Sequence, residues 1–326
     1  MNSDNTIGRP DPGSRSVPRE ASGDDERFVV TAATSATGSA VVEHLLDAGA
    51  QVVAVARDVR RLGAAAGRGA RTFTSALDDA DRLTDVLADA SGAFVMLAPG
   101  LIPDCEDFAS YQRAVIAAQA GAVGEAFRRG RLRRVVTLSG WAANYTGARG
   151  PVWGLRHLEE AIDATGIPAM HLRAGWFMEN LLPDVATLRA TGELSGLLPA
   201  SLPLPMIAVA DIARVAAELL LGVRPFAPGR VQVTGPADRS LAEAATAIGT
   251  AAGIPGARYV ELTEETLRTQ LRRAGFSEHM ADGTVAMTLD VAAGRIHIRE
   301  ADRSVTTTTT LEQFLSTAVG PTARHD

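Results

Sequence analysis

The chain has 326 residues, of which 46% are hydrophobic and 21% are charged, and its formal net charge is −6. These values are typical of a folded enzyme, and no apolar run reaches the roughly 20 residues that a membrane span needs. The most basic stretch, RRGRLRR at 128–134, lies between a predicted helix and a strand, where basic side chains favour a helix C-terminus. We therefore expect neither a nucleic-acid nor a membrane partner.

The composition also excludes several chemistries. All 32 basic residues are arginine, so Schiff-base formation, P-loop phosphate transfer and any mechanism with a catalytic ammonium are ruled out. The single cysteine, Cys105, leaves no intramolecular disulfide and no Cys-cluster metal site. We expect no metal, and a reducing, cytoplasmic location.

The first 26 residues are rich in Pro, Gly, Ser and charge and lack the apolar core of a secretory signal, which predicts a flexible extension. From residue 27, short apolar runs alternate with amphipathic stretches. The predicted strands are 28–31, 51–56, 71–74, 93–97, 134–138 and 169–173, and the predicted helices are 39–48, 80–88, 108–129 and 152–164. This alternation predicts an α/β fold over 27–175, a doubly wound parallel sheet of the Rossmann type that binds ligands at the carboxyl ends of its strands.

After residue 175 the pattern loosens, and we expect a smaller C-terminal substrate lobe over 176–318 with a tail at 319–326. The chain is expected to cross back to the sheet near 206–235, with a helix opening at 210–211 and a strand at 231–234. Further helices are predicted at 240–252 and 263–281 and within the final VTTTTTLEQFL. The apolar, irregular segment 181–207 is expected to cover a pocket.

Several motifs together carry a family resemblance. They include VT-x-AT-x-x-TG at 30–38, ARD after the second strand, LAPG at 97–100, RRVVTLSG at 133–140 and HLEEAIDATGIP at 157–168, followed by LRAGWFMEN at 172–180 and IAVADIARVAAELL at 207–220. The chain resembles NmrA-like members of the atypical short-chain dehydrogenase/reductase superfamily across 27 to about 318. The resemblance implies an NAD(P)-binding fold, in a family that includes quinone, imine and triarylmethane reductases as well as redox-sensing regulators.

The glycine motif of such a turn is altered here, reading Ala32-x-x-Ser35-x-x-Gly38. Alanine in place of glycine at position 32 costs little free energy if its φ is negative. The Ser35 side chain takes space that a phosphate would use, although its hydroxyl could donate a hydrogen bond to a phosphate oxygen. Ser75-Ala76 replaces the Gly-Asp that relatives often place near the adenine. Arg57, at the end of the second strand, suits a 2′-phosphate and favours NADP over NAD. The cofactor site is predicted to comprise Thr31, Ala32, Thr34, Ser35, Ala36, Thr37, Gly38, Arg57, Leu97, Ala98 and Pro99.

The Tyr-x-x-x-Lys pair of many short-chain dehydrogenases falls on Pro151 and Leu155, so its proton-donating phenol is missing. Conjugated acceptors such as quinones, enones and imines remain possible substrates, because they delocalise the charge that a hydride brings. The catalytic candidates are Ser139, Tyr145 and His157. The residues expected to contact a flat or aromatic substrate are Trp141, Trp176, Phe177, Met178 and Asn180.

Three functions follow from these features. The first is an NADPH-dependent reductase of a conjugated small molecule, which could belong to specialised metabolism. The second is a cofactor-independent isomerase, cyclase or dehydratase that reuses the cleft, and the third is a non-enzymatic NADP-sensing regulator. An apolar, aromatic pocket favours an enzyme over a sensor.

Overall fold

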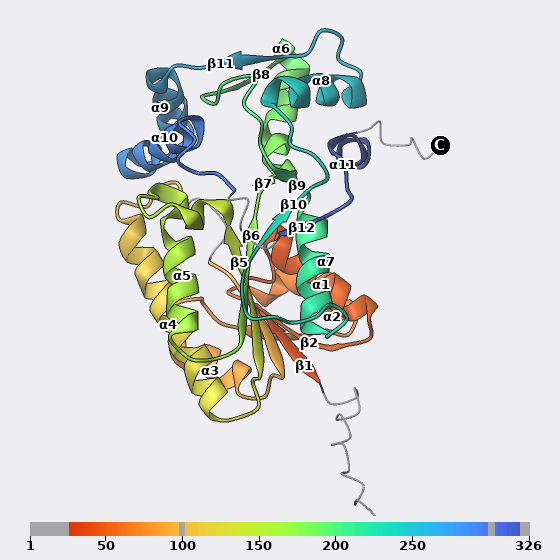
Figure 1. Ribbon diagram of the computed structural model, residues 1–326, viewed down its shortest axis with the longest axis vertical. Coiled ribbons are helices and arrows are strands. Elements are labelled where there is room, and N and C mark those ends of the chain that lie inside the picture. Colours follow the sequence, from red (N-terminus) through yellow and green to blue (C-terminus); the bar gives the residue numbers. More distant parts are fainter. Residues whose placement is uncertain (1–25, 98–101, 299–303, 320–326) are drawn as a thin grey trace, which may run out of the picture.

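The computed structural model describes residues 26–97, 102–298 and 304–319, and an eight-stranded sheet forms its centre (Figure 1). The strand order is β12-β10-β6-β5-β4-β1-β2-β3, and every pair is parallel. The strands are β1 (Arg27–Val30), β2 (Gln51–Ala56), β3 (Arg71–Thr74), β4 (Gly92–Val95), β5 (Arg134–Gly140), β6 (Ala169–Ala174), β10 (Gly229–Thr234) and β12 (Ser304–Thr306). The predicted doubly wound parallel sheet is confirmed.

Helices cover both faces of this sheet (Figure 1). One face carries α1 (Ala36–Asp47), α2 (Gly63–Gly67) and α7 (Val209–Leu220), and the other carries α3 (Ala80–Leu87), α4 (Phe108–Arg128) and α5 (Trp153–Asp163). The central strands are buried on both sides, which is why their sequences are continuous apolar runs rather than alternating ones.

A smaller lobe lies beyond the carboxyl ends of the strands, at the top of Figure 1. It contains the helices α6 (Val185–Thr191), α8 (Leu241–Ala252), α9 (Glu264–Arg273), α10 (Glu278–Ala292) and α11 (Leu311–Ala318), and the short strand pairs β7 (Trp176–Phe177) with β9 (Met206–Ile207) and β8 (Glu193–Gly196) with β11 (Arg258–Glu261). Its apolar core is separate from the two cores that flank the sheet. No helix in the described ranges is both long and apolar enough to cross a membrane.

Several predicted boundaries need correction. The first helix begins at Ala36 rather than Ser39, because the Ser35 hydroxyl caps it by accepting a hydrogen bond from the Gly38 N–H. The predicted helix 263–281 is two helices, since Gly275 adopts a φ of +88° and Ser277 caps a new helix.

The segment 181–207 is not irregular throughout, because it holds α6 and β8. The sequence also gave no indication of β12, a three-residue strand that extends the sheet beside β10. The extension 1–25, the tail after residue 319, and Ala98 and Pro99 lie outside the described residues.

Candidate active site

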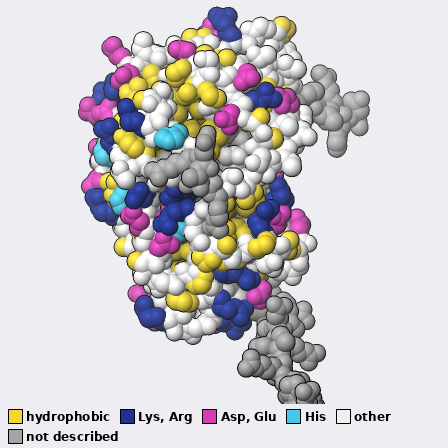
Figure 2. Space-filling view, in the orientation of Figure 1, with side chains coloured by type: hydrophobic (Ala, Val, Ile, Leu, Met, Phe, Trp, Pro, Cys, Tyr) yellow, Lys and Arg dark blue, Asp and Glu magenta, His cyan; other side chains and the backbone are white. Residues whose placement is uncertain are grey.

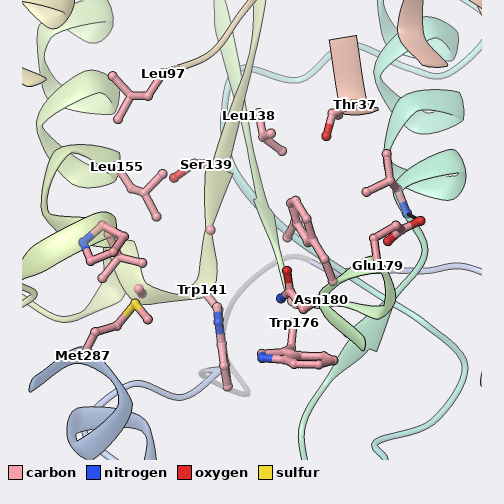
Figure 3. Close-up of a pocket in the computed structure, with 18 of the residues that line it drawn as sticks. Thr37, Leu97, Leu138, Ser139, Trp141, Leu155, Trp176, Glu179, Asn180 and Met287 are labelled. Atoms are coloured by element: carbon pink, nitrogen blue, oxygen red, sulfur yellow. Dashed lines mark hydrogen bonds between the residues drawn. The ribbon is translucent and has the colours of Figure 1, made fainter. Parts of the chain in front are cut away.

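A cavity of about 740 Å³ lies between the carboxyl ends of the central strands and the lobe. It is lined at one end by the start of α1, along its floor by the ends of β4, β5 and β6, and at the other end by the lobe. The lining residues include Ser35, Ala36, Thr37, Met96, Leu97, Gln112, Leu138, Ser139, Trp141, Leu155, Trp176, Phe177, Glu179, Asn180, Val209, Met287 and Val291. Figure 3 shows apolar side chains on both sides of the space, with few polar groups among them.

The position of the cavity follows from the sheet topology. The chain leaves β1 toward α1 on one face, whereas β4, on the other side of β1, leads to α4 on the opposite face. Such a reversal opens a crevice outside the strand ends, where doubly wound folds bind their ligands. Figure 2 shows hydrophobic side chains reaching the surface of the upper lobe, while arginine and acidic side chains are spread over both halves.

The turn between β1 and α1 keeps the shape that glycine normally provides. Ala32 has a φ of +49°, the one positive φ recorded for a non-glycine residue in the described part of the chain. The condition for a low-cost alanine, a negative φ, is therefore not met, and an L-residue is strained in this left-handed region. Gly38 is required, since a Cβ there would lie 2.3 Å from the Ala32 carbonyl oxygen.

The Ser35 hydroxyl is engaged within the protein. It accepts from the Gly38 N–H at 3.0 Å and lies 3.5 Å from the Met96 sulfur. Ser35, Ala36 and Thr37 still line the cavity at the helix N-terminus, where backbone N–H groups lack helical partners. Leu97 lines it too, whereas the Thr31 hydroxyl ties β1 to β4 through Phe94 and Met96, and Thr34 is not among the lining residues.

Arg57 follows β2 directly and is exposed to solvent. Its neighbour Arg60 is held by Asp58 at 2.8 Å, but no ion pair engages Arg57 within the described ranges. The Arg57 guanidinium is thus available to an anion at this edge of the sheet.

The Ser139 hydroxyl lies on the cavity wall, but its proton already takes part in a hydrogen bond within the protein. It donates to Glu159 Oε1 at 2.6 Å, and the Arg173 guanidinium binds both oxygens of the same carboxylate at 2.8 and 2.6 Å. Burial opposes the ionisation of Glu159, yet the hydrogen bonds from Arg173 and Ser139 outweigh it and lower its pKa. Ser139 can therefore accept a hydrogen bond from a ligand more readily than it can donate one.

The other two predicted catalytic side chains do not line the cavity. His157 stacks on Trp153 with ring centroids 4.0 Å apart, and its Nδ1 is 2.9 Å from the Trp153 carbonyl oxygen. Tyr145 is partly exposed and ends the short helical turn η3 (Trp141–Asn144). Neither is among the lining residues.

Four of the five predicted substrate residues, Trp141, Trp176, Phe177 and Asn180, line the cavity. Met178 does not, because it points into the core of the lobe and is 1% exposed. In Figure 3 Asn180 lies above the Trp176 indole, and Trp141 stands beside them.

Sequence reasoning missed three polar residues of the wall, Glu179, Gln112 and Thr288. Glu179 Oε1 accepts the Val209 N–H at 2.9 Å, whereas Glu179 Oε2 is buried with no partner in the described part of the chain. Burial, helped by the nearby Asp211 carboxylate, raises the pKa of Glu179. Gln112, 3% exposed, likewise has a buried, unpartnered Oε1. The signal for Glu179 was an acid inside the apolar GWFM-E-N stretch.

A family model, the NmrA-like family, matches residues 24–289. Comparison with curated protein sequences gives no match. Among solved structures, the NADPH-dependent quinone oxidoreductase QOR2 from Escherichia coli, complexed with NADPH, has a TM-score of 0.70 and 21% identity over 89% of this chain and 99% of its own.

The triphenylmethane reductase of Citrobacter sp., complexed with NADP(H), has a TM-score of 0.73 and 18% identity over 90% of this chain and 99% of its own. AtPrR2 with NADP+ and (+)pinoresinol has a TM-score of 0.70 and 14% identity over 91% of this chain and 100% of its own. At these identities the structures share the fold with this chain.

Proposed function

The chain belongs to the NmrA-like family, and on that premise we propose that it is an NADPH-dependent reductase of a flat, conjugated small molecule. The observation that carries the proposal is one continuous cavity, which joins the start of α1 to the Trp141 and Trp176 indoles. It can accept a dinucleotide at one end and an aromatic substrate at the other. Structures of the same fold have been obtained with NADPH, with NADP(H), and with NADP+ and pinoresinol.

The residues at the α1 end fit the cofactor. The N–H groups of Ala36 and Thr37 open the helix beside the cavity and favour a pyrophosphate there. Arg57 would bind the 2′-phosphate with a guanidinium that no described carboxylate neutralises. When bound, the cofactor would supply a hydride at the strand ends near Leu138 and Ser139.

The wall chemistry limits what can receive that hydride. The chain has no lysine, and the described residues of the cavity wall offer no phenol or imidazole to protonate an alkoxide formed from a simple ketone, which leaves the buried Glu179 carboxyl as the one ionisable group among them. A conjugated acceptor spreads the incoming electron pair and needs less help from the protein. The indoles would hold such a molecule by stacking.

Calorimetric titration with NADPH and NADH, followed by NADPH oxidation with a quinone, an enone, an imine and a saturated ketone, tests the proposal. We expect NADPH to bind more tightly than NADH and turnover to favour the conjugated acceptors. The difference in rate should reach at least the ~10²–10⁴-fold that a positioned acid is worth. Absence of dinucleotide binding would contradict the proposal, and efficient ketone reduction would contradict the argument from the missing acid.

A further inference from the structure

The Ser139 hydroxyl can serve a ligand in one direction only. It donates to Glu159 Oε1 at 2.6 Å. Burial opposes the ionisation of Glu159, but the hydrogen bonds from Arg173 and Ser139 outweigh it and keep the pKa low, so the acceptor is a carboxylate. A hydroxyl has one proton and two lone pairs, and donation to a carboxylate makes its oxygen a stronger acceptor. A ligand at this point of the wall must therefore bring the proton of the hydrogen bond itself.

Glu159 is held so that it cannot turn away from Ser139. The Arg173 guanidinium binds its two oxygens at 2.8 and 2.6 Å, and Arg230 Nε donates to Oε2 at 3.0 Å. Arg173 is fixed in turn by the side-chain oxygen of Asn144. Because Glu159 is 1% exposed, water does not compete for the Ser139 proton. The hydroxyl thus keeps its orientation when a ligand enters the cavity.

The position of Ser139 makes this orientation a means of selection. Ser139 is the penultimate residue of β5, at the strand ends where the proposed hydride would be supplied. A carbonyl oxygen placed there would face the lone pairs of the hydroxyl and would lose its hydrogen bonds to water without replacement. An O–H or N–H group at the same place would be paired. Sites built to pair one polar group reject analogues that lack it.

Three hydrogen-bond donors of the wall lie on the lobe side of Ser139. They are the Asn180 amide and the indole N–H groups of Trp141 and Trp176, and Figure 3 shows all three residues below Ser139, toward the lobe. The indole N–H can only donate, and the amide NH₂ adds two further donors. The cavity thus offers an acceptor beside the proposed hydride position and donors at a distance from it.

We propose that Ser139 is a specificity-determining residue, which selects acceptors that carry an O–H or N–H group beside the carbon that receives the hydride; this inference rests on the proposed reductase function. The carbonyl of such an acceptor points toward Asn180 and the indoles. As the C–H bond forms, the π electrons move through the conjugated system to the carbonyl oxygen, where these donors stabilise the charge. The resulting enolate takes its proton from water. A saturated ketone carries its oxygen on the carbon that receives the hydride, so that oxygen would lie against Ser139 without a donor.

Calorimetry with indole and benzofuran tests this selection without turnover. The two molecules have nearly the same shape, but benzofuran has an oxygen in place of the N–H group and cannot donate. We expect indole to bind roughly tenfold more tightly, which corresponds to about 1.4 kcal/mol. Ser139→Ala removes the acceptor and leaves Arg173 and Arg230 on Glu159, so the variant should lose this preference without losing affinity for benzofuran.

Ser110→Ala is the matched control for this experiment. It removes an exposed serine hydroxyl of α4 that lies outside the cavity wall, so the preference for indole should stay unchanged. Equal binding of indole and benzofuran by the wild type, or a preference that persists in Ser139→Ala, overturns the inference.

Turnover separates this inference from the proposed function. The acceptors are 2-hydroxybenzylideneacetone and 2-methoxybenzylideneacetone, two enones whose ring substituent lies beside the carbon that receives the hydride. In the wild type kcat/KM should be roughly tenfold higher for the hydroxy enone, and in Ser139→Ala the two values should be nearly equal. Reduction of both enones at equal rates by the wild type would leave the reductase standing and refute the role of Ser139. A preference for indole that Ser139→Ala removes, without NADPH oxidation by either enone, would refute the reductase and leave Ser139 as the selective group.

Discussion

Glu159→Gln should destabilise the protein by about 3–5 kcal/mol, the usual cost of breaking a buried ion pair by removing one partner. Glu159 is 1% exposed and receives hydrogen bonds from the Ser139 hydroxyl, from Arg173 Nε and Nη2, and from Arg230 Nε at 3.0 Å. The glutamine amide would place N–H donors against guanidinium donors. Arg173, whose side chain is 8% exposed, would then keep a buried charge without its counterion. Arg230 retains Asp163 at 2.5 Å.

The adjacent residue provides the control for this experiment. Glu160 pairs with Arg156 one helical turn away on the surface, with side-chain exposures of 49% and 39%. Glu160→Gln should therefore cost no more than about 0.5 kcal/mol. The free energy of unfolding of both variants is measured by urea titration. Equal losses in the two variants would refute the reasoning that burial makes the Glu159 pair essential.

The remaining predictions concern the cofactor turn and the acid stability. Ala32→Gly should stabilise the protein by up to about 1 kcal/mol in urea titrations, because glycine adopts a positive φ without strain. Ala36→Gly, in the exposed first turn of α1, is the control and should destabilise the protein. Stabilisation by both changes would contradict the strain argument. Ser35→Gly should tighten NADPH binding in calorimetry and lower the melting temperature slightly through loss of the cap, and weaker binding would instead identify the hydroxyl as a phosphate ligand. Arg57→Ala should abolish the preference for NADPH over NADH, and a preserved preference would exclude Arg57 from the 2′-phosphate site. Because hydrogen bonds from Arg173 and Ser139 lower the pKa of Glu159 despite its burial, its stabilisation is complete above the unfolded pKa of about 4.3 and is lost as the pH falls below it. Stability measured in urea should therefore fall less steeply on acidification in Glu159→Gln than in the wild type, and identical slopes would contradict this.

Local sequence patterns are sufficient to predict most strands of the sheet and the helices that connect them. The buried strands are continuous apolar runs, and the alternation with amphipathic helices determines a parallel order. β12 is not predictable from the sequence, because its three residues show no hydrophobic pattern of their own and form a strand only by pairing with β10. The start of α1 was misplaced because Ser35 was considered as an obstacle to phosphate rather than as a helix cap.

The site was less predictable, because its chemistry depends on contacts between distant segments. The Ser139 hydroxyl donates its hydrogen bond to Glu159, which lies 20 residues further along the chain on α5. Trp141 and Trp176 could be proposed from their places after strand ends, but the partner of Glu179 is the first turn of a helix 30 residues away. Periodicity reports which face of an element is buried and does not show which polar groups meet there.

The most direct test of the central claim follows the hydride itself. The protein is incubated with NADPH deuterated at its transferable hydride position and with a conjugated acceptor, and the product is analysed by mass spectrometry. A reductase places the deuterium on the electrophilic carbon of the product and oxidises one NADPH for each product formed. Conversion of the acceptor without deuterium in the product, or without NADPH oxidation, would contradict the account and favour a reaction that uses the fold without its cofactor.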